Sequence, residues 1–321
     1  MRSIVQNIAD DFFELLRYDK KDWYSYWKIY RERHKPIIEN YERALNLSEE
    51  QSKELLLQLR RPMLDTLMQY WHEKSRDQKL YCSKLISHRH ELFELSKEDF
   101  SIVLTGLLGV KDWVVVDGNT EKVILIDLVS LYEKGTIDKV CEVAFQSVKF
   151  FRDGNISGNY IPKQQLFEDL LNQIEEILKK ADLNESMKRI CELLYSNVAY
   201  YDWVGFYLVD ENKRDELVLG PFVGEPTEHV RIPFGKGICG QAAARGTTFI
   251  VQDVSKETNY LSCSPKVKSE IVVPIKLSEE IYGELDIDSH ILEPFDEEDN
   301  RFLNTICEKI SRKMRGDKEW S

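Results

Sequence analysis

The chain has 321 residues, which is long for one average domain and suits two. Its 42% apolar and 31% charged residues are ordinary for a globular protein in water. The 56 acidic and 44 basic residues give a net charge of −12, which argues against nucleic acid or an anionic membrane as the main partner. Residues 1–160 hold 24 basic and 26 acidic residues and the rest hold 20 and 30, a shift that favours two units.

The cysteine pattern predicts neither a zinc ribbon nor a thioredoxin-type motif, because the six cysteines are widely spread and form no C-x-x-C. The N-terminus reaches Asp10 without the long apolar core of a signal peptide. No run of the sequence approaches the roughly 18 apolar residues that a membrane span needs. We therefore expect a cytoplasmic protein whose cysteines are reduced at rest.

Helical spacing of apolar residues dominates the start of the chain. Residues 4–18 predict a first helix, and residues 22–30 a second whose aromatic side chains share one face. Such a face is more typical of a core than of a ligand cage. A third helix is expected over residues 48–71, where Ser48 and Gln51 resemble a capping box. Two more helices are expected, one at residues 78–94 and one that starts at residue 96 and ends before Gly109.

A β-hairpin then interrupts the helices. Residues 113–118 and 122–127 are apolar and β-branched, and a turn-forming stretch separates them. Helical spacing returns over residues 137–151. We therefore predict a mainly helical domain at residues 1–155, with one small sheet element and no recognised family. The turn-rich stretch at residues 151–162 is the expected linker.

Three histidines of this first half, His72, His88 and His90, are candidate metal ligands by residue type. They form no H-E-x-x-H, and His88 and His90 are two residues apart, so they point in different directions on a helix. Solvated or locally hydrogen-bonded histidines are the better interpretation. No metal site is predicted.

The second half, residues 163–316, predicts helix–helix–strand–strand, an irregular middle, and strand–strand–helix. This order indicates an α+β domain with an antiparallel sheet and helices on one or both faces. The expected helices are residues 163–181, 184–200 and 296–314, the last with acidic residues at its N-terminus. The expected strands are residues 203–209, 216–222, 249–251, 271–277 and 281–287.

Candidate chemistry is concentrated between residues 230 and 288. Asp286 and Asp288 are two residues apart and therefore share one face of a strand. Two carboxylates beside valine, isoleucine and proline are costly unless they are solvated or used. Cys263 and Cys239 are the candidate thiols, although Cys263 can be a small buried residue and Cys239 a turn residue beside Gly240.

These segments together resemble the GAF-domain free methionine-(R)-sulfoxide reductases, over about residues 163–314. The spacings of 24 residues from Cys239 to Cys263, seven from Cys263 to Glu270 and 23 from Cys263 to Asp286 agree with the pattern of that family. The segments that carry the resemblance are residues 203–207 (WVGFY), 219–222 (LGPF), 231–240 (RIPFGKGICG), 269–274 (SEIVVP) and 285–289 (LDIDS).

The resemblance implies a role for each matching residue. Cys263 corresponds to the thiolate that attacks the sulfoxide sulfur and becomes a sulfenic acid. Glu270, Asp286 and Asp288 match the carboxylates around the polar atoms of the substrate, which suits proton donation and ammonium binding. Trp203 and Tyr207 match the aromatic wall against the methyl–sulfur end.

The resemblance also shows departures. The usual resolving cysteine of the family lies ten residues before Cys239, where this chain has His229, so that disulfide cannot form. Resolution would then use Cys239 or an external thiol. The segment around Cys263 differs as well, because Pro265 restricts the backbone there. Lys266 and Lys268 would favour a thiolate if they pointed inward, and solvent is an equally good place for them.

The sequence therefore predicts a methionine-(R)-sulfoxide reductase-like oxidoreductase. It would need no bound cofactor, an external thiol reductant such as thioredoxin, and free methionine sulfoxide or a related small molecule as its partner; a homodimer is compatible with it. The alternative is a GAF sensor that keeps the pocket without turnover. A third hypothesis, an unrelated activity of the first half that the GAF unit regulates, has no catalytic constellation to support it.

Overall fold

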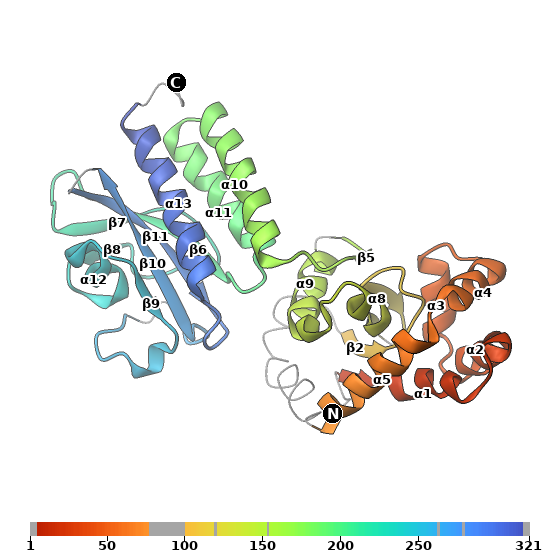
Figure 1. The fold of residues 1–321 in the computed structure, drawn as a ribbon. Helices are drawn as coiled ribbons and strands as arrows, with labels where there is room; N and C mark the ends of the chain where they lie inside the picture. The colour runs from red at the N-terminus through yellow and green to blue at the C-terminus, as the bar shows by residue number, and fades with distance from the viewer. Residues whose placement is uncertain are drawn as a thin grey trace. The chain divides into compact units, whose positions relative to one another are not determined.

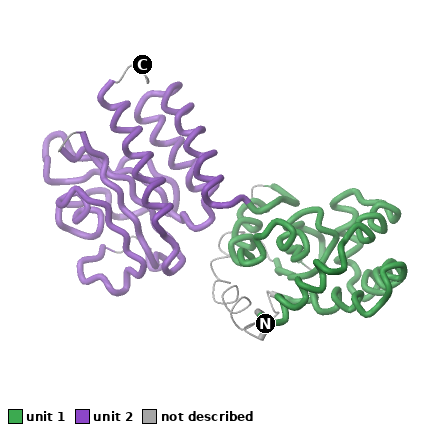
Figure 2. The backbone as a smooth tube through the Cα atoms, viewed as in Figure 1, with its two compact units in different colours: residues 1–160 green, residues 161–321 purple. Residues whose placement is uncertain are grey.

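The computed structural model describes residues 5–76, 100–118, 121–152, 154–261, 264–277 and 280–316 of the chain. The chain divides into two compact units, residues 1–160 and 161–321 (Figure 2). This boundary falls inside the predicted linker at residues 151–162. Among the described residues, no helix combines the length and the apolar character that crossing a membrane requires.

The described part of the first unit contains one mixed sheet with the strand order β1-β2-β4-β3-β5. The predicted hairpin is confirmed, because β3 and β4 pair antiparallel with Val115 opposite Ile124. In contrast, β2 runs parallel to both β1 and β4. The strands are β1 (Val5–Asn7), β2 (Phe100–Thr105), β3 (Trp113–Asp117), β4 (Lys122–Asp127) and β5 (Ser157–Gly158).

Helices make up most of the rest of this unit, as predicted. The aromatic face of the second expected helix is buried core, and the capping box of Ser48 and Gln51 is present. The α-helices are α1 (Ala9–Phe13), α2 (Trp23–Arg33), α3 (Ile37–Ala44), α4 (Glu49–Gln58), α5 (Arg61–Arg76), α8 (Leu128–Glu133) and α9 (Val140–Arg152). Short 3₁₀ turns are η1 (Glu14–Arg17), η2 (Lys20–Asp22) and η3 (Ile137–Lys139).

The prediction of a helix between residue 96 and Gly109 is wrong where the structure describes it, because residues 100–105 form strand β2. All six residues of β2 are buried, so both faces of this strand are covered. A short, continuously apolar run has no periodicity that separates a buried strand from a buried helix. The sheet of the first unit is therefore larger than the single hairpin that we expected.

Two other expected helices are shorter than predicted. Residues 5–7 of the first one pair in parallel with β2, and this tertiary pairing outweighs the local helical spacing. The helix expected over residues 48–71 breaks at Leu59, whose ψ of 136° is extended, and Pro62 follows in the first turn of α5.

The expected helix at residues 78–94 lies outside the described residues, and so do His88 and His90. His72 is described: it is exposed, and its Nε2 lies 3.2 Å from Asp10 Oδ1. Its exposure and this hydrogen-bonded contact agree with the interpretation of His72 as a solvated or hydrogen-bonded histidine.

The second unit contains an antiparallel sheet with the strand order β8-β7-β6-β11-β10-β9 in its described part (Figure 1). Each neighbouring pair is antiparallel, as predicted for this half. The strands are β6 (Trp203–Val209), β7 (Glu216–Val223), β8 (Arg231–Pro233), β9 (Phe249–Val251), β10 (Ser269–Leu277) and β11 (Glu280–Ser289).

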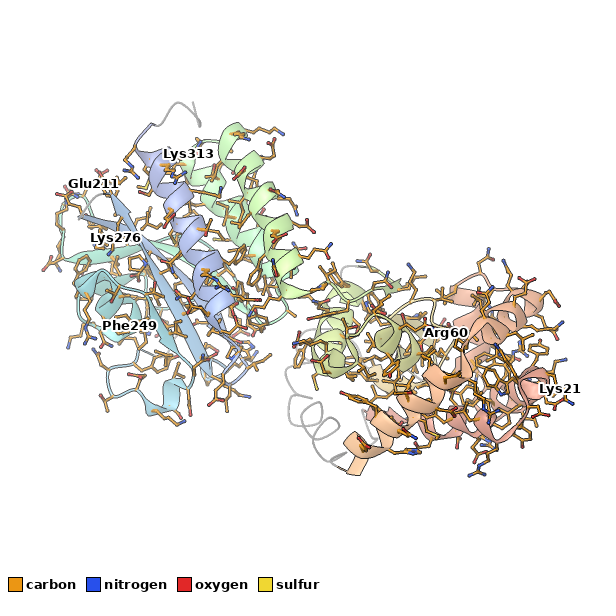
Figure 3. All side chains as sticks on the ribbon, viewed as in Figure 1. Lys21, Arg60, Glu211, Phe249, Lys276 and Lys313 are labelled. Carbon is orange, nitrogen blue, oxygen red and sulfur yellow. The ribbon has the colours of Figure 1, made fainter. Side chains whose placement is uncertain are left out.

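Helices cover both faces of this sheet. On one face, α10 (Lys163–Lys180), α11 (Leu183–Asn197) and α13 (Glu297–Met314) enclose the larger apolar core. On the other face, α12 (Gly237–Arg245) packs over β10 and β11 and encloses a smaller core. A 3₁₀ turn, η4 (Val254–Lys256), follows β9. Figure 3 shows the side chains on these elements, with Phe249 of β9 and Lys276 of β10 labelled.

Candidate active site

Strands β10 and β11 place four acidic side chains on the α12 face of the sheet. Glu284, Asp286 and Asp288 alternate along β11 and therefore point to the same face. Glu270 of β10 lies directly opposite Asp288 in the antiparallel register. Two adjacent central strands thus bring together carboxyl groups that are up to 18 residues apart in the sequence.

Helix α12 brings a thiol to this cluster. Cys239 lies in the first turn of the helix and is buried, with its Sγ 3.3 Å from Asp286 Oδ2 and 3.6 Å from Glu270 Oε1. Cys239 is therefore a helix residue that faces the carboxyl groups.

The turn before α12 determines where Cys239 lies. Gly235 and Gly237 adopt positive φ angles of 84° and 64°, a conformation that glycine tolerates best. The backbone N–H of Gly235 donates to the carbonyl of Gly240 at 2.6 Å, which holds the turn against the helix. A Cβ on Gly240 would lie 2.4 Å from the Pro233 carbonyl oxygen. The close approach of two backbone segments therefore requires a glycine at position 240.

Gly240→Ala is expected to lower the free energy of unfolding by about 1–3 kcal/mol, because backbone atoms cannot yield to the added methyl group. Cys239 should also react faster with an alkylating reagent once the turn is displaced. Chemical denaturation and mass spectrometry measure the two effects. Ala244→Ser on the exposed side of the same helix is the control and should change stability by less than about 0.5 kcal/mol. Equal stability of Gly240→Ala and the wild type would contradict the packing argument.

Burial dominates the electrostatics of the cluster. Glu270, Glu284, Asp286 and Asp288 are each at most 4% exposed. Burial raises the pKa of Asp286 from 3.8 to about 7, while its hydrogen bond with Cys239 acts in the opposite direction. Burial also raises the pKa of Glu270 and of Asp288 well above their ordinary values, and the charge of Asp286 adds to both. Carboxyl groups in this cluster therefore hold protons at neutral pH, which suits proton donation.

The raised pKa of Asp286 predicts a pH dependence of stability. Below about pH 4 the carboxyl group of Asp286 is protonated in both the folded and the unfolded chain. Its burial then causes no pH-dependent loss of the free energy of unfolding. As the pH rises toward 7, the unfolded chain releases this proton first, so the folded state loses stability relative to it. The neighbouring carboxyl groups titrate together with Asp286, so only part of the pH-dependent loss belongs to Asp286 alone. We expect Asp286 to account for a loss of unfolding free energy on the order of 2 kcal/mol between pH 4 and pH 7.

Asp286→Asn removes this titration. The unfolding free energy of the variant minus that of the wild type should therefore increase between pH 4 and pH 7, as measured by urea denaturation at each pH. Asp215→Asn, at an exposed position, controls for the loss of one negative charge. A difference that stays constant with pH for Asp286→Asn would show that the carboxyl group does not change its proton occupancy on folding.

The two predicted aromatic residues form one wall of the same face. The ring of Trp203 stacks on Phe222 at a centroid distance of 5.5 Å and on Tyr207 at 6.3 Å. Hydrogen bonds fix their polar ends, because Trp203 Nε1 donates to the Glu225 carbonyl at 3.0 Å and the Tyr207 hydroxyl donates to the His229 carbonyl at 2.9 Å. His229 is thus tied through its backbone to the aromatic wall.

Cys263 lies outside the described residues, but the segments on both sides of it are held to the site. On one side, Asn259 Nδ2 donates to the Gly235 carbonyl at 2.8 Å, and Asn259 Oδ1 accepts from the Gly237 N–H at 3.2 Å. On the other side, the Lys268 N–H donates to the Ser289 carbonyl at 2.9 Å. The chain that flanks Cys263 is therefore bonded to the start of α12 and to the end of β11.

Lys266 is the first basic residue after Cys263. Lys266 pairs with Glu225 at 2.7 Å, and both side chains are partly exposed. Lys266 therefore lies at the surface, which is the outward of the two orientations that the sequence left open.

Comparisons with known proteins agree with this arrangement. The family model described as GAF domain matches residues 182–314. The chain is 37% identical over 153 residues to Protein YtsP of Bacillus subtilis, covering 47% of this chain and 93% of that protein. It is 32% identical over 151 residues to the free methionine-R-sulfoxide reductase of Escherichia coli, covering 47% of this chain and 89% of that enzyme. It is 34% identical over 164 residues to the enzyme of the same name from Saccharomyces cerevisiae, covering 49% and 90%.

The chain belongs to the GAF-domain family that includes the free methionine-R-sulfoxide reductases. The resemblance read from the sequence motifs is thereby confirmed for the second unit. The family match lies entirely within that unit, so the first unit stands outside it.

Two residues of this GAF domain were not selected from the sequence. Glu284 is completely buried beside Asp286. The sequence could have indicated it, because a residue two positions before Asp286 on a strand points to the same face. Gly205 lies opposite Asp286 in the sheet, and a Cβ there would lie 2.2 Å from the ring of Trp203. The absence of a side chain at Gly205 thus leaves room for the ring of Trp203. In the sequence, the only sign of this role is the position of Gly205 between Trp203 and Tyr207.

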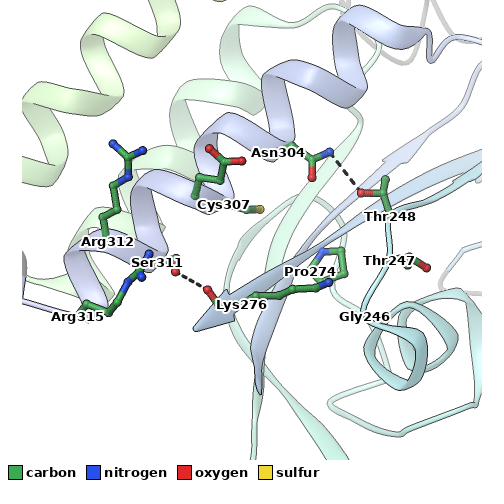
Figure 4. A pocket seen from close by; sticks show the side chains of 11 residues that line it. Gly246, Thr247, Thr248, Pro274, Lys276, Asn304, Cys307, Ser311, Arg312 and Arg315 are labelled. Atoms are coloured by element: carbon green, nitrogen blue, oxygen red, sulfur yellow. Dashed lines mark hydrogen bonds between the residues drawn. The ribbon is translucent and has the colours of Figure 1, made fainter. Parts of the chain in front are cut away.

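A separate recess of about 580 Å³ lies in the GAF domain between the end of β10 and α13 (Figure 4). Lys276, Arg312 and Arg315 line it, with Cys307 at one side. An Asn304–Thr248 hydrogen bond of 3.3 Å crosses its edge. None of the described residues that we predicted for the site lines this recess, so it is distinct from the thiol–carboxyl cluster.

Proposed function

We propose that the protein reduces free methionine-(R)-sulfoxide to methionine, with Cys263 as the nucleophile. The observation that carries the proposal is the match to two free methionine-R-sulfoxide reductases over 89% and 90% of their lengths. The buried thiol and carboxyl groups of the GAF domain support it, because they supply the groups that this reaction needs.

The reaction would proceed in three balanced steps. The Cys263 thiolate forms a bond to the sulfoxide sulfur while the sulfoxide oxygen takes a proton. The resulting hydroxyl group then passes from the substrate sulfur to the Cys263 sulfur as the bond between the two sulfurs breaks. Methionine leaves and Cys263 carries the oxygen as a sulfenic acid. A second thiol then forms a disulfide with Cys263 and releases water, and an external dithiol such as thioredoxin reduces this disulfide by thiol–disulfide exchange.

The carboxyl cluster would act on the polar atoms of the substrate. A protonated member, with its pKa raised by burial, donates to the sulfoxide oxygen, and an ionised member binds the ammonium group. Trp203 and Tyr207 would contact the methyl–sulfur end, because an aromatic ring attracts thioether and sulfonium-like groups. The sulfoxide oxygen, the ammonium group and the methyl–sulfur end would thus each have a matching group among Glu270, Asp286, Asp288 and the aromatic wall.

Cys239 is the proposed resolving thiol. Asp286, 3.3 Å from its sulfur, can accept its proton, since a carboxyl group with a pKa of about 7 is a suitable base at neutral pH. An external thiol would otherwise attack the sulfenic acid directly, because His229 occupies the position where the resemblance places the usual resolving cysteine.

The test is a turnover assay on the two epimers of free methionine sulfoxide, with dithiothreitol or thioredoxin as reductant. We expect the R epimer to be consumed with release of methionine, and the S epimer to remain. If the R epimer also remains while Cys263 is open to alkylation, the reductase proposal is rejected.

His229 also favours one alternative, a GAF sensor that binds the small molecule without reducing it. Thermal unfolding with methionine, its sulfoxides and cyclic nucleotides separates the two functions. A ligand-dependent rise in melting temperature without turnover would support the sensor.

A further inference from the structure

Three potential metal-binding atoms meet at the cluster. The Cys239 sulfur, one Glu270 oxygen and one Asp286 oxygen all lie within 4.8 Å of one another, and all three residues are buried. A helix supplies the sulfur, and two paired central strands supply the oxygens. Such elements hold ligand atoms more rigidly than loops do.

The distances between these atoms suit a tetrahedral ion. Zinc bonds of about 2.3 Å to sulfur and about 2.0 Å to oxygen, at a tetrahedral angle, separate the two ligand atoms by about 3.5 Å. The observed distances from the Cys239 sulfur are 3.3 Å to Asp286 and 3.6 Å to Glu270. An S–H···O hydrogen bond spans a similar distance, so a second observation has to decide between them.

Unpartnered oxygens provide that observation. Both carboxyl oxygens of Glu284, Oδ1 of Asp286 and Oδ1 of Asp288 are buried without a hydrogen-bond partner among the described residues. No lysine, arginine or histidine of the described chain forms an ion pair with these groups or with Glu270. A buried carboxyl group without a partner is costly, so the cluster needs protons or a cation.

We propose that Cys239, Glu270 and Asp286 form a binding site for a divalent transition-metal ion of the zinc type. The thiolate selects zinc over magnesium or calcium, which prefer oxygen ligands alone. Three protein ligands leave a fourth position for water or an added ligand. Glu284 lies beside Asp286 on the same face of the strand.

Metal binding would take up the same groups that the proposed reduction uses. On binding, the Cys239 sulfur forms a bond to the metal and releases its proton to solvent, and any protons on the two ligating carboxyl groups are released as well. The bound ion thus removes the Cys239 thiol and two carboxyl groups from substrate chemistry. Metal binding at this site is measured without substrate, so its outcome does not depend on whether the protein reduces methionine sulfoxide.

The test uses the reduced full-length protein and Co²⁺ as a spectroscopic probe. We expect a thiolate-to-cobalt charge-transfer band that saturates at one equivalent and disappears when Zn²⁺ is added. Cys239→Ser should abolish the band, whereas Cys141→Ser in the first unit should keep it. Asp286→Asn and Glu270→Gln, which preserve side-chain size, should each weaken Co²⁺ binding by at least about tenfold, or about 1.4 kcal/mol.

Several results would overturn the site: no band, a band that persists in Cys239→Ser, or unchanged affinity in both carboxyl variants. X-ray absorption of the zinc-loaded wild type does not depend on the folding of any variant. It should find one sulfur at about 2.3 Å and the remaining ligands as oxygen or nitrogen. Two sulfurs would replace the proposed ligand set by a pair of cysteines.

Discussion

Cys263→Ser is expected to reduce turnover of free methionine-(R)-sulfoxide by at least about 10³-fold, equivalent to about 4 kcal/mol of transition-state stabilisation. A thiolate forms near neutral pH and attacks sulfur readily, whereas a serine hydroxyl does neither. Stopped assays that quantify methionine by chromatography measure the loss. Residual turnover within about tenfold of the wild type would remove Cys263 from the nucleophile role.

Cys239→Ser separates the two thiol roles. If Cys239 resolves the sulfenic acid, this variant should release one equivalent of methionine and then slow down, and a sulfenic-acid reagent should label Cys263. If an external thiol resolves it, turnover with excess dithiothreitol should continue at the wild-type rate. Cys141→Ser is the matched control, since Cys141 lies in the first unit and should not change either phase.

Asp299→Ala is expected to lower the unfolding free energy of the GAF unit by about 3–5 kcal/mol, because a buried charged network loses its centre. The Asp299 carboxylate is completely buried and accepts hydrogen bonds from Tyr200 and Tyr201 at 2.8 Å each. It also pairs with Lys163, and it caps α13 through the Asp296 N–H at 2.9 Å. This one side chain therefore joins the start of α10, the segment before β6 and the start of α13.

Chemical denaturation measures this loss. Asp299→Asn should cost less than Asp299→Ala, since an amide oxygen still accepts from a tyrosine while the ion pair with Lys163 is lost. Glu297→Ala, exposed in the same helical turn, is the control and should cost less than about 0.5 kcal/mol. A loss below about 1 kcal/mol for Asp299→Ala would mean that the network is not structurally important.

Hydrophobic periodicity predicted the secondary structure correctly where an element has one solvent-exposed and one buried face. The helices α10, α11 and α13 follow the predicted ranges to within a few residues. It failed for residues 100–105, which are buried on both faces of the mixed sheet. A continuous apolar run does not record which neighbours surround it, and the parallel pairing with β1 and β4 involves residues far away in the chain.

The sequence by itself determined the family of the second half, the antiparallel strands and the shared face of Asp286 and Asp288. Strand alternation is a local property, so two residues at i and i+2 must point the same way. Motif spacing likewise depends only on the order of residues, and the comparisons agree with it.

Only the tertiary structure decided that the Cys239 sulfur meets Asp286 and Glu270, and that Glu284 is buried with them. Those contacts depend on how α12 packs across β10 and β11, which no local pattern encodes. The proton affinity of the carboxyl groups follows from the same packing, because burial by α12 and the sheet is what raises the pKa of Asp286 to about 7.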